Sequence, residues 1–167
     1  MQDHQSGKTS WSFKKDGTRV TEVDFLIEDK LREQITSTYP DHGILGEERE
    51  PINPNADFVW VLDPIDGTFG FSKGVPLFGN LIGLTYKGRP LYGFLRLPMI
   101  NDTWISGDCK QSIINGKSLN PKAFSGMKDS LILTTDQQTL INSPFNKCWQ
   151  KAITLGAIAR TWGDSYG

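Results

Sequence analysis

The sequence has few cysteines. Cys109 and Cys148 are the only two among 167 residues, and they lie far apart without metal-ligand spacing. Disulfide frameworks need several patterned cysteines, and structural zinc sites need closely spaced Cys or His pairs. Both classes are therefore excluded, and we expect the two thiols to be buried as small apolar side chains.

An excess of charge and a long hydrophobic run are also missing. Lys plus Arg number 18 and Asp plus Glu number 19, which leaves a net charge of -1. Binding to nucleic acid or an anionic membrane normally needs a basic surface, so we expect neither partner. No apolar stretch approaches the ~20 residues that cross a bilayer, and residues 1–8 lack a signal-peptide core, so we expect a cytoplasmic protein. We also expect one domain over residues 1–167.

Apolar periodicity predicts an amphipathic helix over residues 22–37. Thr21 is in position to cap it, with Asp24 at the capping-box distance, and Tyr39-Pro40 should end it. The apolar residues recur at helical spacing. They are Val23, Ile27, Leu31 and Ile35, with Phe25 and Leu26 widening the stripe.

The rest of the chain alternates irregularly between strand and helix patterns. A continuous β-prone run at residues 58–62 predicts a buried strand, and a turn at residues 87–90 predicts a hairpin. Further strands are predicted at residues 81–86, 91–97, 103–106 and 131–134, with a turn at 115–116 and a helix from about Pro144. This irregular order favours an α+β layered fold over a doubly wound parallel sheet.

Acidic residues follow two of the apolar runs. Asp63 and Asp66 leave the run at 58–62 through a Pro-containing turn, and Glu47-Glu48 follow Ile44-Leu45. Magnesium prefers carboxylate and carbonyl oxygens together with water and substrate phosphate. Each carboxylate taken alone is also typical of a turn, a helix cap or a solvated loop. The joint pattern predicts a metal and phosphate site.

Residues 60–68, with the sequence Trp-Val-Leu-Asp-Pro-Ile-Asp-Gly-Thr, resemble the signature of the inositol monophosphatase family. Residues 17–24 resemble that family's lysine-to-aspartate opening motif, and residues 44–48 resemble its acidic-pair motif. The resemblance runs from about Lys14 to the end. It implies a layered αβαβα fold, two or three Mg²⁺ ions in the complete enzyme, hydrolysis of a small phosphomonoester and a possible homodimer.

The resemblance also implies the metal ligands. Carried over by motif, these are Glu47, Asp63, the carbonyl of Ile65 and Asp66. Glu47 would bridge two ions. Glu48 is open to two interpretations, as a functional or as a merely structural member of the pair.

The same carry-over implies the catalytic and phosphate-binding groups. Besides Glu47, Asp24 would hold a metal-bound water and Thr68 would help to orient the attacking water. Asp66 and the backbone N–H groups of Gly67 and Thr68 would bind the substrate phosphate, whose displacement needs charge neutralisation.

Within the family, three segments look most like the histidinol-phosphate phosphatase branch. They are residues 71–79, 131–135 and 160–166. This favours L-histidinol phosphate as substrate, in histidine biosynthesis, with inositol 1-phosphate or another sugar or nucleotide monophosphate as the alternative. Asp164 could pair with the substrate amine or merely cap a helix. Ser165 stands where the branch commonly has cysteine.

The family's second metal also takes an aspartate from a downstream Trp-Asp or Tyr-Asp motif, which these residues do not contain. We therefore expect an incomplete fold that lacks C-terminal layers, and a 167-residue chain inactive by itself.

A haloacid-dehalogenase-type phosphatase is a second interpretation, but its two aspartates lie two residues apart, unlike Asp63 and Asp66. A third is an inactive partial domain acting as a binding module. His42 is expected to be a loop residue.

Overall fold

The structure is a computed structural model that describes residues 11–13, 19–108, 110–120 and 122–161. The chain divides into two compact units, Met1–Asn120 and Pro121–Gly167, each described here by itself. The expectation of a single partial domain over residues 1–167 stays a prediction.

The predicted amphipathic helix is present as α1 (Glu22–Thr38). It follows a small antiparallel pair, β1 (Trp11–Phe13) and β2 (Arg19–Thr21). The backbone N–H of Thr21 donates to the Asp24 carboxylate at 2.8 Å, which confirms the capping box. Tyr39 is the C-cap, as its position before Pro40 predicts.

A seven-stranded sheet with the order β3-β4-β5-β6-β7-β8-β9 forms the body of the first unit. β3 and β4 are parallel and every other neighbouring pair is antiparallel. The strands are β3 (Gly43–Gly46), β4 (Phe58–Asp66), β5 (Gly79–Tyr86), β6 (Arg89–Leu97), β7 (Thr103–Gly107), β8 (Ser112–Ile114) and β9 (Lys117–Leu119).

Two tight turns join neighbouring strands of this sheet. Lys87 and Gly88 both have positive φ, as do Asn115 and Gly116, which is the backbone that two-residue hairpins adopt. The first turn confirms the predicted hairpin. The second joins β8 to β9, two short strands that the sequence pattern did not reveal.

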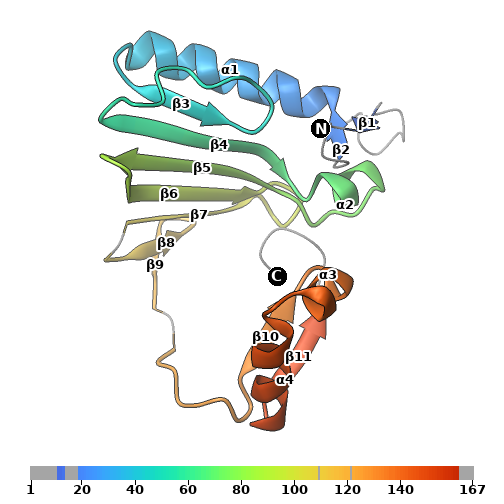
Figure 1. The fold of residues 1–167 in the computed structure, drawn as a ribbon. Coiled ribbons are helices and arrows are strands. Elements are labelled where there is room, and N and C mark those ends of the chain that lie inside the picture. The colour runs from blue at the N-terminus through green and yellow to red at the C-terminus, as the bar shows by residue number, and fades with distance from the viewer. Residues whose placement is uncertain (1–10, 14–18, 109, 121, 162–167) are drawn as a thin grey trace. The chain divides into compact units, whose positions relative to one another are not determined.

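α1 lies along one face of the sheet, over β3 and β4 (Figure 1). Its apolar stripe contributes to two buried clusters: Ile35, Ile44 and Leu62 with Leu31, Trp60 and Ile82, and Ile65, Phe71 and Phe78 with Val23 and Ile27. Leu26, which was expected to widen the stripe, is 57% exposed, because its position on the helix turns it away from the sheet. That part of the prediction is wrong.

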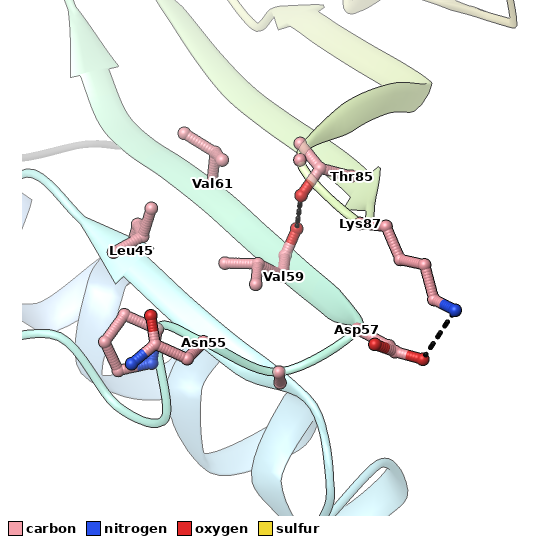
Figure 2. A pocket seen from close by; sticks show the side chains of 10 residues that line it. Leu45, Asn55, Asp57, Val59, Val61, Thr85 and Lys87 are labelled. Carbon is pink, nitrogen blue, oxygen red and sulfur yellow. Dashed lines mark hydrogen bonds and ion pairs between the residues drawn. The ribbon is translucent and has the colours of Figure 1, made fainter.

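The second face of the sheet is only partly covered around β4, where Val59 is buried but Val61 is not. Val59 and Val61 alternate with Trp60 and Leu62, which face α1, and Val61 is 42% exposed. The continuous apolar run of β4 therefore covers one buried and one partly exposed face among the described residues. A pocket of about 480 Å³ lies here, lined in part by Leu45, Val59, Val61 and Thr85, with the Asp57–Lys87 ion pair at its rim (Figure 2).

The second unit is a small β-α-α-β arrangement. It contains β10 (Leu131–Thr134), α3 (Gln137–Asn142), α4 (Asn146–Thr154) and β11 (Ile158–Thr161), and the two strands pair in parallel. β10 and α4 were predicted, whereas α3 was missed. Cys148 is exposed on α4, so the expectation of a buried thiol is wrong there because the residue lies on the helix's outer face; Cys109 lies outside the described residues.

These elements form a mixed α+β fold with a largely antiparallel sheet, which confirms the predicted fold class. None of the described helices is long and apolar enough to cross a membrane.

Candidate metal and phosphate site

The carboxylates singled out in the sequence gather where β3 and β4 end. Because these strands are parallel, their carboxyl ends meet at one edge of the sheet. Gly46 pairs with Leu62, and the next residue, Glu47, donates its backbone N–H to the Leu62 carbonyl at 3.2 Å. Glu47 is thus held beside Asp63, the residue that follows Leu62 in β4.

A β-bulge brings Asp63 and Asp66 to one face of β4. Asp63 pairs with Leu81 and Asp66 with Gly79, so three steps along β4 match only two along β5. In a regular strand, side chains three residues apart point to opposite faces. The extra residue in the bulge reverses that alternation, and the two aspartates share a face.

The strand therefore continues through residues 63–66, where the sequence predicted a turn. The predicted turn is therefore wrong. Proline has no N–H to donate, but it is tolerated in a strand at a bulge. The Asn80 side chain donates to the Pro64 carbonyl at 2.6 Å, which satisfies the irregular backbone. The sequence did not reveal this role of Asn80, because the register between β4 and β5 decides which carbonyl its side chain reaches.

Gly67 and Thr68 follow the bulge directly. Gly67 has φ 88°, the left-handed region that favours glycine, and caps the short helix α2 (Thr68–Ser72). The Thr68 hydroxyl donates to the Ile65 carbonyl at 2.8 Å. The first N–H groups of a helix lack intrahelical partners, which makes them available in principle to an anion.

Several carboxyl groups influence one another in this site. The pKa of Asp63 is raised to about 8, first by burial and then by the neighbouring charge of Glu47, with Asp66 and Asp24 adding to the effect. One oxygen of Asp63, Oδ1, is buried without a hydrogen-bond partner among the described residues. Like charges and an unsatisfied buried oxygen are costly unless a cation neutralises them.

The donor atoms of this site are of the chemical type that binds a hard cation. Every candidate donor is a carboxylate or carbonyl oxygen, as magnesium prefers. Within the described part of the chain, no three His, Cys, Asp or Glu side chains already form a group that could hold a metal ion. The carboxylates therefore lie at the same edge of the sheet, but they do not form a complete coordination sphere.

Asp24 reaches this edge from α1. It is 1% exposed and accepts hydrogen bonds from the N–H and the hydroxyl of Thr21. Its charge also contributes to the raised pKa of Asp63. Asp24 is thus both a helix cap and a neighbour of the carboxylates.

A second buried polar group lies one turn further along α1 and was missed in the sequence. Glu28 is fully buried and accepts from Arg32 Nε at 2.8 Å and from the backbone N–H groups of Glu48 at 2.8 Å and Arg49 at 3.1 Å. The signal in the sequence was a Glu and an Arg at i,i+4 spacing, in step with Asp24. Such a pair is usually exposed, so its spacing did not reveal burial.

The remaining predicted residues lie apart from this edge or beyond the described chain. His42 is a loop residue, as expected, and its ring stacks on Tyr39 and Phe58 with centroid distances of 4.8 and 4.9 Å. Asp164 lies outside the described residues. The pocket in Figure 2 is lined by none of the candidate site carboxylates.

Sequence comparison shows which proteins the chain is similar to. The pattern of the inositol monophosphatase family matches residues 2–165. A histidinol-phosphatase of Chlorobaculum parvum is 31% identical over 154 residues, which cover 92% of this chain and 60% of that protein. The chloroplastic bifunctional phosphatase IMPL2 of Arabidopsis thaliana is 36% identical over 124 residues, covering 73% of this chain and 36% of the relative.

The fold is found in a solved structure as well. The extragenic suppressor protein suhB of Bartonella henselae superposes with a TM-score of 0.81 at 22% identity, covering 98% of this chain and 64% of that one. The chain thus spans less than two thirds of the length of each of these three proteins.

Proposed function

The chain belongs to the inositol monophosphatase family, and from this premise we propose that the protein is a magnesium-dependent phosphomonoesterase. The observation that carries the proposal is the bulge between Asp63 and Asp66, which turns both carboxylates to one face of β4 beside Glu47. A strand that served only the fold would have no reason to gather like charges there.

In this proposal Glu47, Asp63, Asp66 and the Ile65 carbonyl hold Mg²⁺, which would neutralise phosphate charge and lower the pKa of a bound water. The Thr68 hydroxyl donates to the Ile65 carbonyl and therefore lies beside this proposed ligand. It would orient the attacking water.

Phosphate binding is assigned to the neighbouring backbone. The N–H groups of Gly67 and Thr68, at the left-handed turn before α2, would donate to the phosphate oxygens. α2 has five residues, so its dipole is small and individual N–H groups carry this role. Asp24 would hold a water from the α1 side.

The substrate proposed is L-histidinol phosphate. Support comes from the C. parvum relative, which carries the name histidinol-phosphatase, and from the branch-like segments at residues 71–79 and 131–135. The metal and phosphate groups cannot discriminate among substrates, because they contact only the group common to all of them. Inositol 1-phosphate is the competing substrate. The homodimer stays a prediction.

The test measures phosphate release by the full-length protein from both substrates. We expect activity that needs Mg²⁺, is lost in excess EDTA and is inhibited by Ca²⁺, with a higher kcat/KM for L-histidinol phosphate. An Asp164→Asn variant should raise KM for that substrate. Full activity in EDTA would reject the metal site, and a preference for inositol 1-phosphate would reject the substrate. Mg²⁺ binding without turnover would favour a binding module.

A further inference from the structure

Glu28 and Arg32 contact the backbone that directly follows Glu47. The segment after β3, residues 47–50, forms bends without regular secondary structure. Its backbone groups find partners on two α1 side chains. Glu28 accepts from the N–H groups of Glu48 and Arg49, as described above.

Arg32 completes the arrangement from the same helix. Its Nη1 donates to the Glu50 carbonyl at 3.0 Å and its Nη2 to the Arg49 carbonyl at 3.1 Å, while its Nε donates to Glu28. Arg32 is 8% exposed and Glu28 is not exposed at all. Two consecutive N–H groups and two consecutive carbonyls of the loop are thus held by one buried ion pair, which we call the α1 clamp.

Gly46 lets β3 approach the α1 clamp closely. A Cβ at this position would lie 2.0 Å from Glu28 Oε1 and 2.7 Å from Arg32 Nη2. Any other residue would displace the clamp or the strand. Glu47 follows at once, and its own N–H is bound to Leu62. Its backbone is therefore fixed by β4 on one side and by the α1 clamp on the other.

We propose that Glu28 and Arg32 are positioning residues that hold the backbone around Glu47 so that its carboxylate meets Asp63 and Asp66 in a geometry suited to Mg²⁺. This inference rests on the proposed function, because it gives Glu47 a role as a metal ligand. Neither residue is a candidate ligand itself, since both direct their polar atoms to the loop backbone and to each other. Partners of this kind typically change metal affinity about 10–100-fold when they are removed.

The direction of the Arg32 effect separates positioning from simple electrostatics. Removal of a positive charge near a cation site should tighten Mg²⁺ binding if long-range charge were the only influence. Removal of the clamp should weaken it. Arg32→Lys adds a milder change, because it keeps the charge but loses the planar fork that reaches two carbonyls.

The experiment titrates Mg²⁺ alone into the full-length protein by calorimetry and follows amide hydrogen exchange over residues 47–50. In Glu28→Gln and Arg32→Gln we expect Mg²⁺ affinity to fall about 10–100-fold and exchange at 47–50 to accelerate, with smaller changes of the same sign in Arg32→Lys. At saturating Mg²⁺, kcat should recover most of its value, since the ligand is displaced and not lost.

Asp29→Asn is the matched control. Asp29 also reaches Arg49, but it pairs with the side chain at 2.7 Å on the surface and leaves the backbone alone. Its removal should change Mg²⁺ affinity by less than about 2-fold. Melting curves without Mg²⁺ identify any variant that fails to fold, and Arg32→Lys is the variant expected to remain folded.

Three results would overturn the inference. One is unchanged Mg²⁺ affinity in folded Arg32→Lys and Glu28→Gln, whatever their melting temperatures, because a purely structural pair would behave this way. Another is tighter Mg²⁺ binding in Arg32→Gln. The third is absence of Mg²⁺ binding in the unsubstituted protein, which would overturn the proposed metal site as well. Mg²⁺ binding without phosphatase activity would overturn the proposed activity and leave the α1 clamp supported if the variants still weaken binding.

Discussion

Two groups of charged side chains meet α1 one turn apart, at Asp24 and at Glu28, and are built in opposite ways. Near Asp24, burial and then the charges of Glu47, Asp66 and Asp24 raise the pKa of Asp63, and one oxygen of Asp63 has no hydrogen-bond partner among the described residues. At Glu28 and Arg32, opposite charges meet at 2.8 Å and bind the backbone of residues 48–50. The first group costs free energy until a cation arrives, whereas the second is compensated within the fold.

The first group would hold the metal ion directly, whereas the second stabilises the fold and the loop beside Glu47. A compensated buried pair is strongly destabilising to break, because the remaining partner is left as an isolated charge. A like-charge cluster behaves in the reverse way, since removing one member relieves repulsion. Substitutions in the Glu28–Arg32 pair should therefore lower stability more than turnover, and substitutions among the carboxylates should lower turnover more than stability.

The largest effect on stability is expected for Glu28→Ala. It leaves Arg32 buried without its ionic partner and two backbone N–H groups without an acceptor, so the free energy of unfolding should fall by about 3–5 kcal/mol. Urea denaturation of the full-length protein measures this. Asp29→Ala, next in sequence but exposed, should show no resolvable change. Equal stability of the two variants would contradict the contrast between the groups.

Asp63→Asn should have the largest effect on turnover. The amide keeps the shape but loses the charge, so kcat/KM should fall by about 10²–10³-fold. The metal-free protein should become more stable, because a neutral amide avoids the cost of burying a carboxylate beside the charge of Glu47. Asp57→Asn serves as the control, since Asp57 is exposed and pairs with Lys87 at 3.6 Å. A near-normal rate for Asp63→Asn at saturating Mg²⁺ would remove Asp63 from the site.

The raised pKa of Asp63 predicts a pH dependence of stability without metal. Its ordinary value is 3.8 and its folded value is about 8, so the folded state binds the proton more tightly than the unfolded state. Stability is then fully present below pH 4 and declines as pH rises toward 8. Melting temperatures in EDTA from pH 5 to 9 should fall more for the unsubstituted protein than for Asp63→Asn. Parallel curves would argue against the shift.

The smallest effect is expected for Asn80→Ala, which removes the donor to the Pro64 carbonyl in the bulge. Loss of this hydrogen bond should lower the free energy of unfolding by about 0.5–1.5 kcal/mol. Mg²⁺ affinity should weaken modestly, because the bulge sets the common face of Asp63 and Asp66. Asn55→Ala, in the loop before the opposite end of β4, is the comparison variant. If Mg²⁺ binding is unaffected, the bulge is held by Pro64 and the register alone.

Much of the first unit could be predicted because its signals are local. The spacing of Val23, Ile27 and Leu31 together with the Thr21 cap predicted α1 to within a residue at its end. The turn at residues 87–90 predicted the hairpin of β5 and β6, since glycine adopts positive φ easily, as Gly88 does here. The motif at residues 60–68 led to the family, which the comparisons confirm.

The sequence by itself thus determined the helix, the main strands, the family and the carboxylates to consider. Only the tertiary structure decided that residues 63–66 form a bulge and not a turn, because strand register depends on pairing with β5, more than ten residues away. It also decided that Glu28 and Arg32 are buried on the loop beside Glu47. An i,i+4 charge pair looks the same in sequence whether it faces solvent or a backbone 17 to 21 residues away.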